Sequence, residues 1–325
     1  MTVVMLPARL HENPDLCAAY IRTLGGSVKI GLLGWDYSGI DPDGPALMEF
    51  GRERGHEMTF FTLEEITYRS GTNGVEIGLG GEPAASFDAV INRSKLYGDD
   101  WQDRVERLSM LSNVPGLRLF DPADAWVTGY SKFQMAQRLA AAGIPVPPIR
   151  SAVTLADVEA AYQEWGPLVL KPSFGYRGND VERIADLTAD KAIVEDLLSR
   201  FPTLVCQPYY STAGGEYRIT VAGTATPLNT LKLPAAGSWR CKTMEGSSFE
   251  RLDAPDELVE LSLRATRAMG LTLAGLDILP HDSGYLVLEV NPVPGFLDLM
   301  GKEQHRQVLG GVFDWAEARI AETAE

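Results

Sequence analysis

The sequence is poor in cysteine and has no long apolar run. Its three cysteines, Cys17, Cys206 and Cys241, lie far apart and lack the paired spacing of zinc sites or redox motifs. We therefore expect them to be packing residues in a reducing compartment. The first residues lack a basic segment followed by a long apolar core, and no later stretch reaches the ~18 to 20 apolar residues of a membrane helix. These absences predict a cytoplasmic protein with no membrane partner.

Positive charge is also scarce. The chain has 29 basic and 44 acidic side chains, which gives a formal net charge of −15. Because this charge repels a nucleic-acid backbone, no nucleic-acid partner is expected. The 325 residues, of which 45% are hydrophobic, are enough for two or three lobes with their own cores. The sequence does not show whether the protein is a monomer or a homo-oligomer.

Residues 271–296 are the most informative stretch of the chain. Two apolar runs flank His-Asp-Ser-Gly there, and the second run closes on Glu289-Val290-Asn291. If residues 282–284 form a three-residue hairpin loop, the register places Asp277 opposite Glu289, and Asn291 shares their face. Two carboxylates and an amide at a strand end suit a hard divalent ion such as Mg²⁺. The alternative is an edge hairpin whose polar residues face water, and this stretch alone does not decide between them.

The first third of the chain alternates between strand and helix patterns, which predicts a small parallel α/β lobe ending near Asp121-Pro122. Strands are expected at 28–34, 58–62 and 87–92, and helices at 45–54 and 101–111. Residues 1–27 show no strong period and are interpreted as an arm on this lobe. The segment GLLGWDYSG lacks G-x-G-x-x-G and starts no helix, so a dinucleotide site is not favoured.

Two cations follow the third predicted strand. Arg93 and Lys95 lie just past its C-terminal end, where open α/β sheets usually hold ligands. The pair is suited to a carboxylate or phosphate of a substrate. Surface charges in a turn are the alternative interpretation.

Two lysines occupy unusual positions further along. Lys132 lies in the first turn of a helix predicted at 128–142, which Thr128 or Ser131 can cap, and a cation at this end of a helix suggests an anionic ligand. Chance placement is the alternative. Lys171 lies inside an apolar strand predicted at 167–172, where an unpaired lysine is costly.

A glycine-punctuated turn follows Lys171. Gly175 and Gly178 let main-chain amides approach phosphates, and Arg177 adds positive charge. The turn is not a Walker loop, because the lysine precedes the glycines and a strand follows them. A plain hairpin is the alternative. The remaining predicted elements are strands at 181–184, 203–210, 214–221 and 227–233 and helices at 157–165, 257–269 and 310–323.

The order of these features resembles the ATP-grasp superfamily, most closely its RimK-like carboxylate–amine ligases. The similarity covers about residues 126–300 and rests on GYSKFQMAQRLAAAGIPVPP, LVLKPSFGYRG, GEYRITVAG and AGLDILPHDSGYLVLEVNPVPG. The resemblance implies an α/β (α+β ATP-grasp) fold, in which an N-terminal parallel α/β lobe precedes two antiparallel-sheet lobes that clamp ATP. The implied domains are a substrate lobe at 1–125, a lid lobe at 126–205 and a lobe with the metal site at 206–325.

The resemblance also implies roles for individual residues. The cofactor-binding residues, for ATP, would be Lys132, Lys171, Ser173, Gly175, Arg177, Gly178, Gln207, Tyr209, Tyr210 and Glu216. The catalytic residues would be Arg218, Arg240 and Lys242, and the substrate residues Arg93 and Lys95. The ligands of Mg²⁺, or of Mn²⁺ in its place, would be Asp277, Glu289 and Asn291.

The chain departs from the family pattern in three places. Pro208 replaces an acidic residue near the adenine, and Cys241-Lys242 replaces a small polar residue and an asparagine after the arginine. Phe174, Tyr176 and Arg177 make the phosphate loop bulkier than in most members.

The resemblance implies an ATP-dependent ligase that activates a carboxylate as an acyl phosphate and couples it to an amine. Its partners would be small-molecule carboxylates and amines, or a peptide. A cyclo-ligase or kinase with the same nucleotide site, and a non-catalytic nucleotide-binding regulator, are the alternatives. Lysines, arginines and a metal suffice for this chemistry, and the four histidines are scattered, with His281 interpreted as a loop residue.

Overall fold

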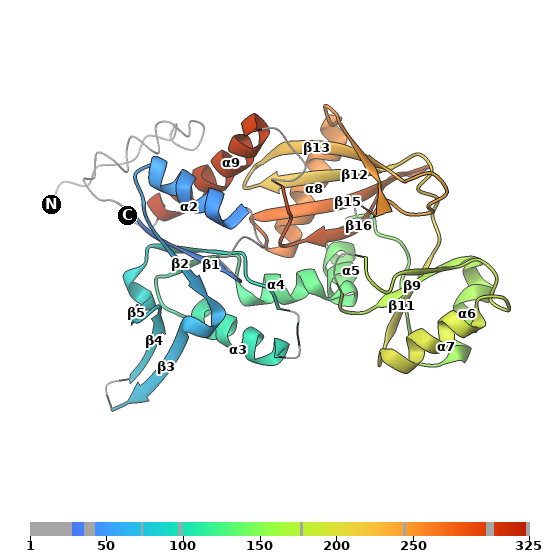
Figure 1. Ribbon diagram of the computed structural model, residues 1–325, viewed down its shortest axis with the longest axis horizontal. Coiled ribbons are helices and arrows are strands. Elements are labelled where there is room, and N and C mark those ends of the chain that lie inside the picture. Colours follow the sequence, from blue (N-terminus) through green and yellow to red (C-terminus); the bar gives the residue numbers. More distant parts are fainter. Residues whose placement is uncertain are drawn as a thin grey trace.

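The computed structural model describes residues 28–35, 43–72, 74–96, 98, 100–175, 178–242, 245–296 and 302–322. Its strands form four sheets. They belong to three bodies that lie side by side, namely the first lobe, a small sheet with its helices and a large sheet with its helices (Figure 1). The predicted arm at 1–27, with Cys17, and the predicted phosphate-loop residue Arg177 lie outside the described residues. No helix in the described part of the chain is long and apolar enough to cross a membrane.

The first lobe contains the predicted parallel sheet, in the order β2-β1-β6-β7, with every pairing parallel. Its strands are β1 (Lys29–Gly34), β2 (Glu57–Thr62), β6 (Ala89–Asn92) and β7 (Arg118–Phe120). Helices α2 (Asp43–Glu53) and α3 (Trp101–Ser112) accompany the sheet. The prediction of a parallel α/β lobe is therefore confirmed.

A second, three-stranded antiparallel sheet extends from this lobe and was not predicted (Figure 1). It consists of β3 (Ile66–Gly71), β4 (Gly74–Leu79) and β5 (Glu82–Pro83), bounded by the 3₁₀ turns η2 (Leu63–Glu65) and η3 (Ala84–Ser86). After Ile66, every residue of β3 is exposed. Because no face of this strand enters a core, its sequence lacks the alternation that indicates a half-buried strand.

The single helix predicted at 128–142 is wrong, because two helices occupy this region. α4 (Ala123–Tyr130) ends and α5 (Lys132–Ala141) begins on either side of Ser131, whose backbone is extended. The Ser131 hydroxyl accepts a hydrogen bond from the Gln134 amide at 3.3 Å, so Ser131 is the N-cap, as one of the two predicted alternatives. The break places Lys132 at the first position of α5.

The small sheet has the order β10-β9-β11-β8. Its elements are β8 (Arg150–Ala152), α6 (Leu155–Trp165), β9 (Leu168–Pro172), β10 (Glu182–Ile184), α7 (Lys191–Arg200) and β11 (Leu204–Pro208). Thr154 and Asp157 form a capping box at the start of α6. A separate hydrophobic cluster, which includes Leu170 and Val194, joins the helices to the sheet.

The large sheet is antiparallel, with the order β14-β13-β12-β15-β16. Its strands are β12 (Glu216–Ala222), β13 (Ala225–Leu233), β14 (Ser248–Arg251), β15 (Leu273–His281) and β16 (Gly284–Asn291), and its helices are α8 (Asp256–Met269) and α9 (Lys302–Ala321). Buried residues of α8 such as Leu258 and Ala265 share one cluster with Ile219 and Leu276 of the sheet. That cluster also contains Leu33 and Val90 of the first lobe, so the large sheet and the first lobe share a core. The domain boundaries at 125/126 and 205/206 stay a prediction.

The predicted three-residue loop of the final hairpin is wrong, but the predicted register at its functional end is confirmed. His281 pairs with Gly284, so the loop has two residues, Asp282 and Ser283. A bulge at Leu288 then shifts the pairing by one residue, and Asp277 lies opposite Glu289 as expected.

Candidate active site

A cavity of about 620 Å³ is lined by residues from all three bodies. The first lobe, the small sheet and the large sheet each contribute charged side chains to it.

One face of the large sheet supplies a row of charges. Arg218 pairs with Asp277 across β12 and β15, and Asp277 pairs with Glu289 across β15 and β16. Cross-strand partners share a face of the sheet, so these three side chains form one row. Their neighbours Ile219, Leu276 and Val290 are buried on the opposite face, against α8. Because successive residues of these strands point to opposite faces, the apolar residues enter the core and the charged residues line the cavity.

The charges of this row are tightly paired. Asp277 Oδ1 accepts hydrogen bonds from Arg218 Nη1 at 3.0 Å and from Lys232 Nζ at 2.9 Å. Lys232 also forms a short ion pair with Glu216, its cross-strand partner on β12. Burial alone would raise the pKa of Asp277, but the charges of Lys232 and Arg218 outweigh it and hold that pKa below its usual value. Burial, followed by the Asp277 charge, raises the pKa of Glu216 to about 7.

Arg218 needs a glycine on the adjacent strand. A Cβ at Gly275 would lie 2.5 Å from Arg218 Nη2. Real Cβ atoms do not approach this closely, and the guanidinium is additionally fixed by Asp277, so a side chain at 275 would displace the arginine.

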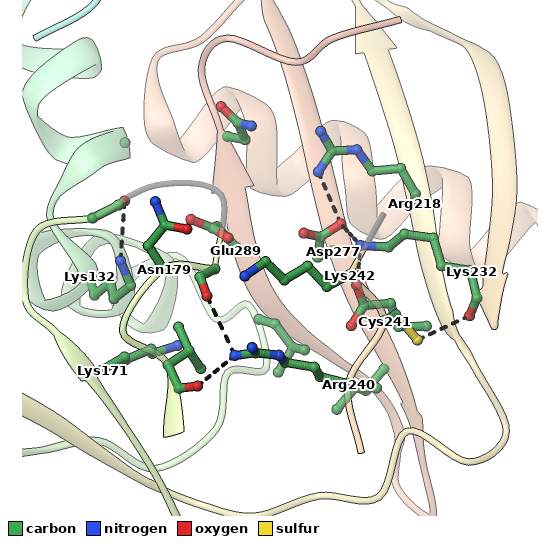
Figure 2. Close-up of a pocket in the computed structure, with 18 of the residues that line it drawn as sticks. Lys132, Lys171, Asn179, Arg218, Lys232, Arg240, Cys241, Lys242, Asp277 and Glu289 are labelled. Carbon is green, nitrogen blue, oxygen red and sulfur yellow. Dashed lines mark hydrogen bonds and ion pairs between the residues drawn. The ribbon is translucent and has the colours of Figure 1, made fainter. Parts of the chain in front are cut away.

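Two lysines face this row from the other side of the cavity (Figure 2). Lys132 comes from the start of α5 and Lys171 from β9. Burial, followed by the charge of Lys132, lowers the pKa of Lys171 to about 8. Burial also lowers the pKa of Lys132, against the opposing effect of Glu289. An arrangement that lowers the pKa of two adjacent lysines favours an anion between them.

Arg240 and Lys242 come from the segment after β13. Arg240 forms a bidentate pair with Glu245, at 3.1 and 2.6 Å, and donates to the Val181 carbonyl at 2.6 Å. Arg240 thus connects the large sheet to Val181, which directly follows the glycine-rich loop at 173–180. Lys242 Nζ lies 3.5 Å from Glu245, and its side chain extends into the cavity toward Glu289 (Figure 2). The thiol of the intervening Cys241 donates to the Lys232 carbonyl at 3.3 Å, and burial raises the pKa of this thiol to about 11.

The predicted metal ligands lie together at the end of the β15–β16 hairpin. Asp277 and Glu289 are cross-strand neighbours, Asn291 follows on the same face of β16, and all three line the cavity. Among the described residues no group of three or more His, Cys, Asp or Glu side chains forms a metal site. The set of two carboxylates and an amide nevertheless fits a hard ion that completes its shell with water and phosphate oxygens.

The first lobe closes the opposite end of the cavity. Arg93 is 2% exposed and pairs with Asp43 at 3.1 Å, so its interpretation as a surface charge is wrong. Lys95 Nζ lies 3.6 Å from the centroid of the Trp35 ring. Both cations line the cavity.

The structure brings most of the predicted site residues to this one cavity. Those that line it are Arg93, Lys95, Lys132, Lys171, Gly175, Gly178, Gln207, Tyr210, Glu216, Arg218, Arg240, Lys242, Asp277, Glu289 and Asn291. Ser173 and Tyr209 do not line it. The Ser173 carbonyl accepts a hydrogen bond from the Lys132 amide, and the Tyr209 ring packs on Arg183 and Trp239.

Lys232 is the site residue that the sequence reasoning did not single out. It holds Glu216 and Asp277 together and is 7% exposed. The signal was present, because Lys232 is a lysine inside an apolar strand, the same feature that singled out Lys171.

Comparisons with known proteins agree with this arrangement. The family model of the RimK-like ATP-grasp domain matches residues 129–308. The chain belongs to the RimK-like ATP-grasp family. The predicted family, fold class and ligase activity are thereby confirmed, and this ATP-grasp protein is an ATP-dependent carbon–nitrogen ligase, a class that uses ATP with a divalent metal ion.

Three similar proteins illustrate the family. A protein from Xanthomonas euvesicatoria pv. vesicatoria named "Probable alpha-L-glutamate ligase" is 29% identical over 258 residues, which is 78% of this chain and 86% of that protein. The solved structure of the ligase PsnB with a phosphomimetic variant of its minimal precursor, Mg and ADP is 23% identical, with a TM-score of 0.67, over 90% of this chain and 98% of that one. D-cycloserine synthetase DcsG is 23% identical, with a TM-score of 0.66, over 90% and 99%.

Proposed function

We propose that this ATP-grasp ligase couples a carboxylate to the amine of an amino acid or peptide, with its chemistry in the 620 Å³ cavity. The observation that carries the proposal is the placement of Lys132 and Lys171 across this cavity from the row of Arg218, Asp277 and Glu289. Phosphoryl transfer requires mainly positioning and neutralisation of charge. Cations on one wall and oxygen donors on the other supply both.

The ATP-binding residues have distinct tasks in this proposal. Lys132 and Lys171 bind phosphates, and the glycine-rich loop at 173–180 covers them. Gln207 and Tyr210, which line the cavity, face the adenine mainly through their main chain, while Tyr209 lies behind them. Glu216 accepts hydrogen bonds from the ribose, in an orientation that its ion pair with Lys232 fixes.

Asp277, Glu289 and Asn291 would hold a divalent ion, Mg²⁺ or Mn²⁺, through oxygen atoms. A divalent ion held there would supply positive charge next to the phosphates. Arg218 lies beside these donors, because its guanidinium shares Asp277 with Lys232. It therefore orients Asp277 as well as contributing positive charge.

Arg240 and Lys242 would neutralise the transferred phosphoryl group. Both are held by Glu245 in pairs that remain partly exposed. Exposed pairs are weak, so a phosphoryl group with more than one negative charge competes well with this single carboxylate. The planar guanidinium of Arg240 can bind either the Glu245 carboxylate or the phosphoryl group through two parallel hydrogen bonds.

The substrates are proposed to lie toward the first lobe. Arg93 and Lys95 line this end of the cavity and provide positive charge for substrate carboxylates. The naming of relatives as alpha-L-glutamate ligases supports an acidic amino acid as the amine substrate, and the precursor in the PsnB structure makes a peptide the next class to test.

Hydroxylamine trapping tests the proposal. Purified protein is incubated with Mg·ATP, hydroxylamine and a panel of amino acids and dipeptides, and both ADP and hydroxamate are measured. A ligase is expected to form both with its own acid, because hydroxylamine intercepts the acyl phosphate. ADP without hydroxamate indicates a kinase, and neither product indicates a regulator.

Glu289→Gln is the matched control for this experiment. It removes one charged oxygen donor and keeps the shape of the side chain, so ADP release is expected to fall by about 100-fold or more, since even indirect metal contacts are worth 10–100-fold. Full ADP release by this variant at saturating Mg²⁺ would contradict the metal assignment and leave the ligase proposal open.

A further inference from the structure

The glycine-rich loop carries an exposed aromatic ring to which the proposed reaction assigns no task. Phe174 is 49% exposed and stacks on Trp101, which is 42% exposed, with ring centroids 6.1 Å apart and planes 28° from parallel. Neither ring belongs to the three hydrophobic clusters of the described residues. The contact therefore joins two surface side chains from distant parts of the sequence, outside any core.

The backbone of Phe174 is fixed to the start of α5. Ser131 and Phe174 form an antiparallel bridge, and the Lys132 amide donates to the Ser173 carbonyl at 3.0 Å. Lys132 Nζ donates to the Gly175 carbonyl at 3.4 Å. The loop is thus attached on one side to a lysine proposed to bind phosphate.

Trp101 is fixed to the substrate end of the cavity. It is the first residue of α3 and follows the segment that carries Lys95. One turn further on, Arg104 pairs with Asp100 at 2.9 Å and donates to the Lys95 carbonyl at 3.4 Å. The same arginine therefore holds the start of α3 and the backbone of Lys95.

We propose that Trp101 is a positioning residue for the ligase reaction, which acts through Phe174 to fix the glycine-rich loop against the Lys95 segment. The proposal rests on the proposed function, because it assigns ATP phosphates to the loop and a substrate to the Lys95 segment. A loop that is already in place binds phosphate better than one that must be ordered on binding. The stack also sets the distance between the phosphate loop and the substrate end.

The size of residue 174 fits this assignment. Phe174 is one of the side chains that make this loop bulkier than expected for the family, and a small residue at 174 could not reach Trp101. The size of Phe174 is therefore explained by its contact with Trp101. Backbone contacts to phosphate do not require a large side chain at position 174.

The test uses Trp101→Ala, Phe174→Ala, the double variant and Trp101→Phe, which keeps a stacking ring. Tyr68→Ala is the matched control, because Tyr68 is a 56% exposed aromatic residue on β3 that does not line the cavity. The readouts are hydrogen–deuterium exchange of peptides from 173–180 without nucleotide, the Kd for Mg·AMPPNP, and KM for ATP and kcat.

Each single alanine variant is expected to speed exchange in the loop and to raise the Kd for Mg·AMPPNP and the KM for ATP by about threefold to tenfold. The kcat should change less. The double variant is expected to lose no more nucleotide affinity than the single variant with the larger loss, because the two rings act as one unit. Trp101→Phe should recover most of the affinity, and Tyr68→Ala should match the wild type.

Additive losses in the double variant, or unchanged loop exchange in Trp101→Ala, would overturn the proposal. The exchange measurement requires no turnover. A wild-type protein that releases no ADP would therefore contradict the proposed function, while the exchange data would still decide whether the stack holds the loop.

Discussion

Lys171 shows how a single residue in this pocket responds to its surroundings. It lies on an apolar strand, and burial together with Lys132 lowers its pKa to about 8. The charges of Glu289 and Glu216 act in the opposite direction, and with a pKa of about 8 the amine is mostly protonated at neutral pH. Its ability to bind phosphate therefore depends on pH in the range used for assays.

We predict that nucleotide affinity falls as the pH rises through about 8. Only the protonated amine of Lys171 attracts phosphate, so above its pKa binding must take up a proton, and the Kd for Mg·AMPPNP should rise by up to about tenfold per pH unit. Lys171→Arg, which stays charged, should give a flatter profile. Calorimetric titrations from pH 6.5 to 9 measure both.

The comparison isolates Lys171 from its neighbours. Glu216, with a pKa of about 7, titrates lower and is present in both proteins. Lys191→Arg, an exchange at an exposed position on α7, should leave the profile unchanged. A wild-type Kd that stays constant to pH 9 would contradict a Lys171 that binds phosphate with a pKa of about 8.

At the scale of elements, α9 is attached to the first lobe by one buried carboxylate. Glu317 accepts two hydrogen bonds from Arg54, both at 2.7 Å, and lies 2.8 Å from His56 Nε2. Burial would raise the pKa of Glu317, but the hydrogen bonds from His56 and Arg54 outweigh it and hold this pKa below its ordinary value of 4.5. The last helix is thus joined to the turn between α2 and β2 through ion pairs between segments that are distant in sequence.

We predict that Glu317→Gln lowers the free energy of unfolding by about 2 kcal/mol at pH 7, because it removes the buried carboxylate charge that pairs with Arg54 and His56, while Arg54 keeps its pair with Asp314. Since the folded-state pKa is depressed, this stabilisation is present above pH 4.5 and lost as the pH falls through the folded-state value. Urea titrations at pH 7 and pH 4 should therefore show a smaller difference between the two proteins at pH 4. Glu322→Gln, at a surface pair on the same helix, should change stability by less than about 1 kcal/mol.

The whole molecule consists of a first lobe and large sheet with a common core and a small sheet with a core of its own. The cavity lies where these parts meet, so a nucleotide bound in it would contact both the small sheet and the large sheet, whose apolar residues belong to separate clusters. We therefore expect nucleotide binding to stabilise the position of the small sheet relative to the large sheet as well as the site itself.

We predict that Mg·AMPPNP raises the thermal midpoint of unfolding by about 5 °C at 100 times its Kd, which follows from mass action of a ligand on the folded state. Differential scanning calorimetry measures the shift. The metal complex should stabilise more than the nucleotide with EDTA, and Glu289→Gln should reduce that difference. An equal shift with and without Mg²⁺ would contradict a metal site at Asp277, Glu289 and Asn291.

Much of the fold could be predicted because its signals are local. Strand β1 of the first lobe is a nearly continuous apolar run, and α8 has a clear helical period. The β3–β5 sheet was missed because β3 is almost entirely exposed, and the break at Ser131 was missed because a bridge to Phe174 stabilises it. Exposure and long-range pairing leave little trace in a local window.

The sequence by itself determined the family and the alternation of the strands that carry the site, because these depend on side-chain type and on a period of two residues. The pairing of Asp277 with Glu289 was expected from a three-residue loop, but the structure reaches it with a two-residue loop and a bulge at Leu288. Only the tertiary structure decided that Lys232 joins Glu216 to Asp277, that Arg93 is buried against Asp43, and that Trp101 meets Phe174. Each of these contacts joins different elements of the fold. Their distances depend on how the lobes pack together, which no single segment of the chain encodes.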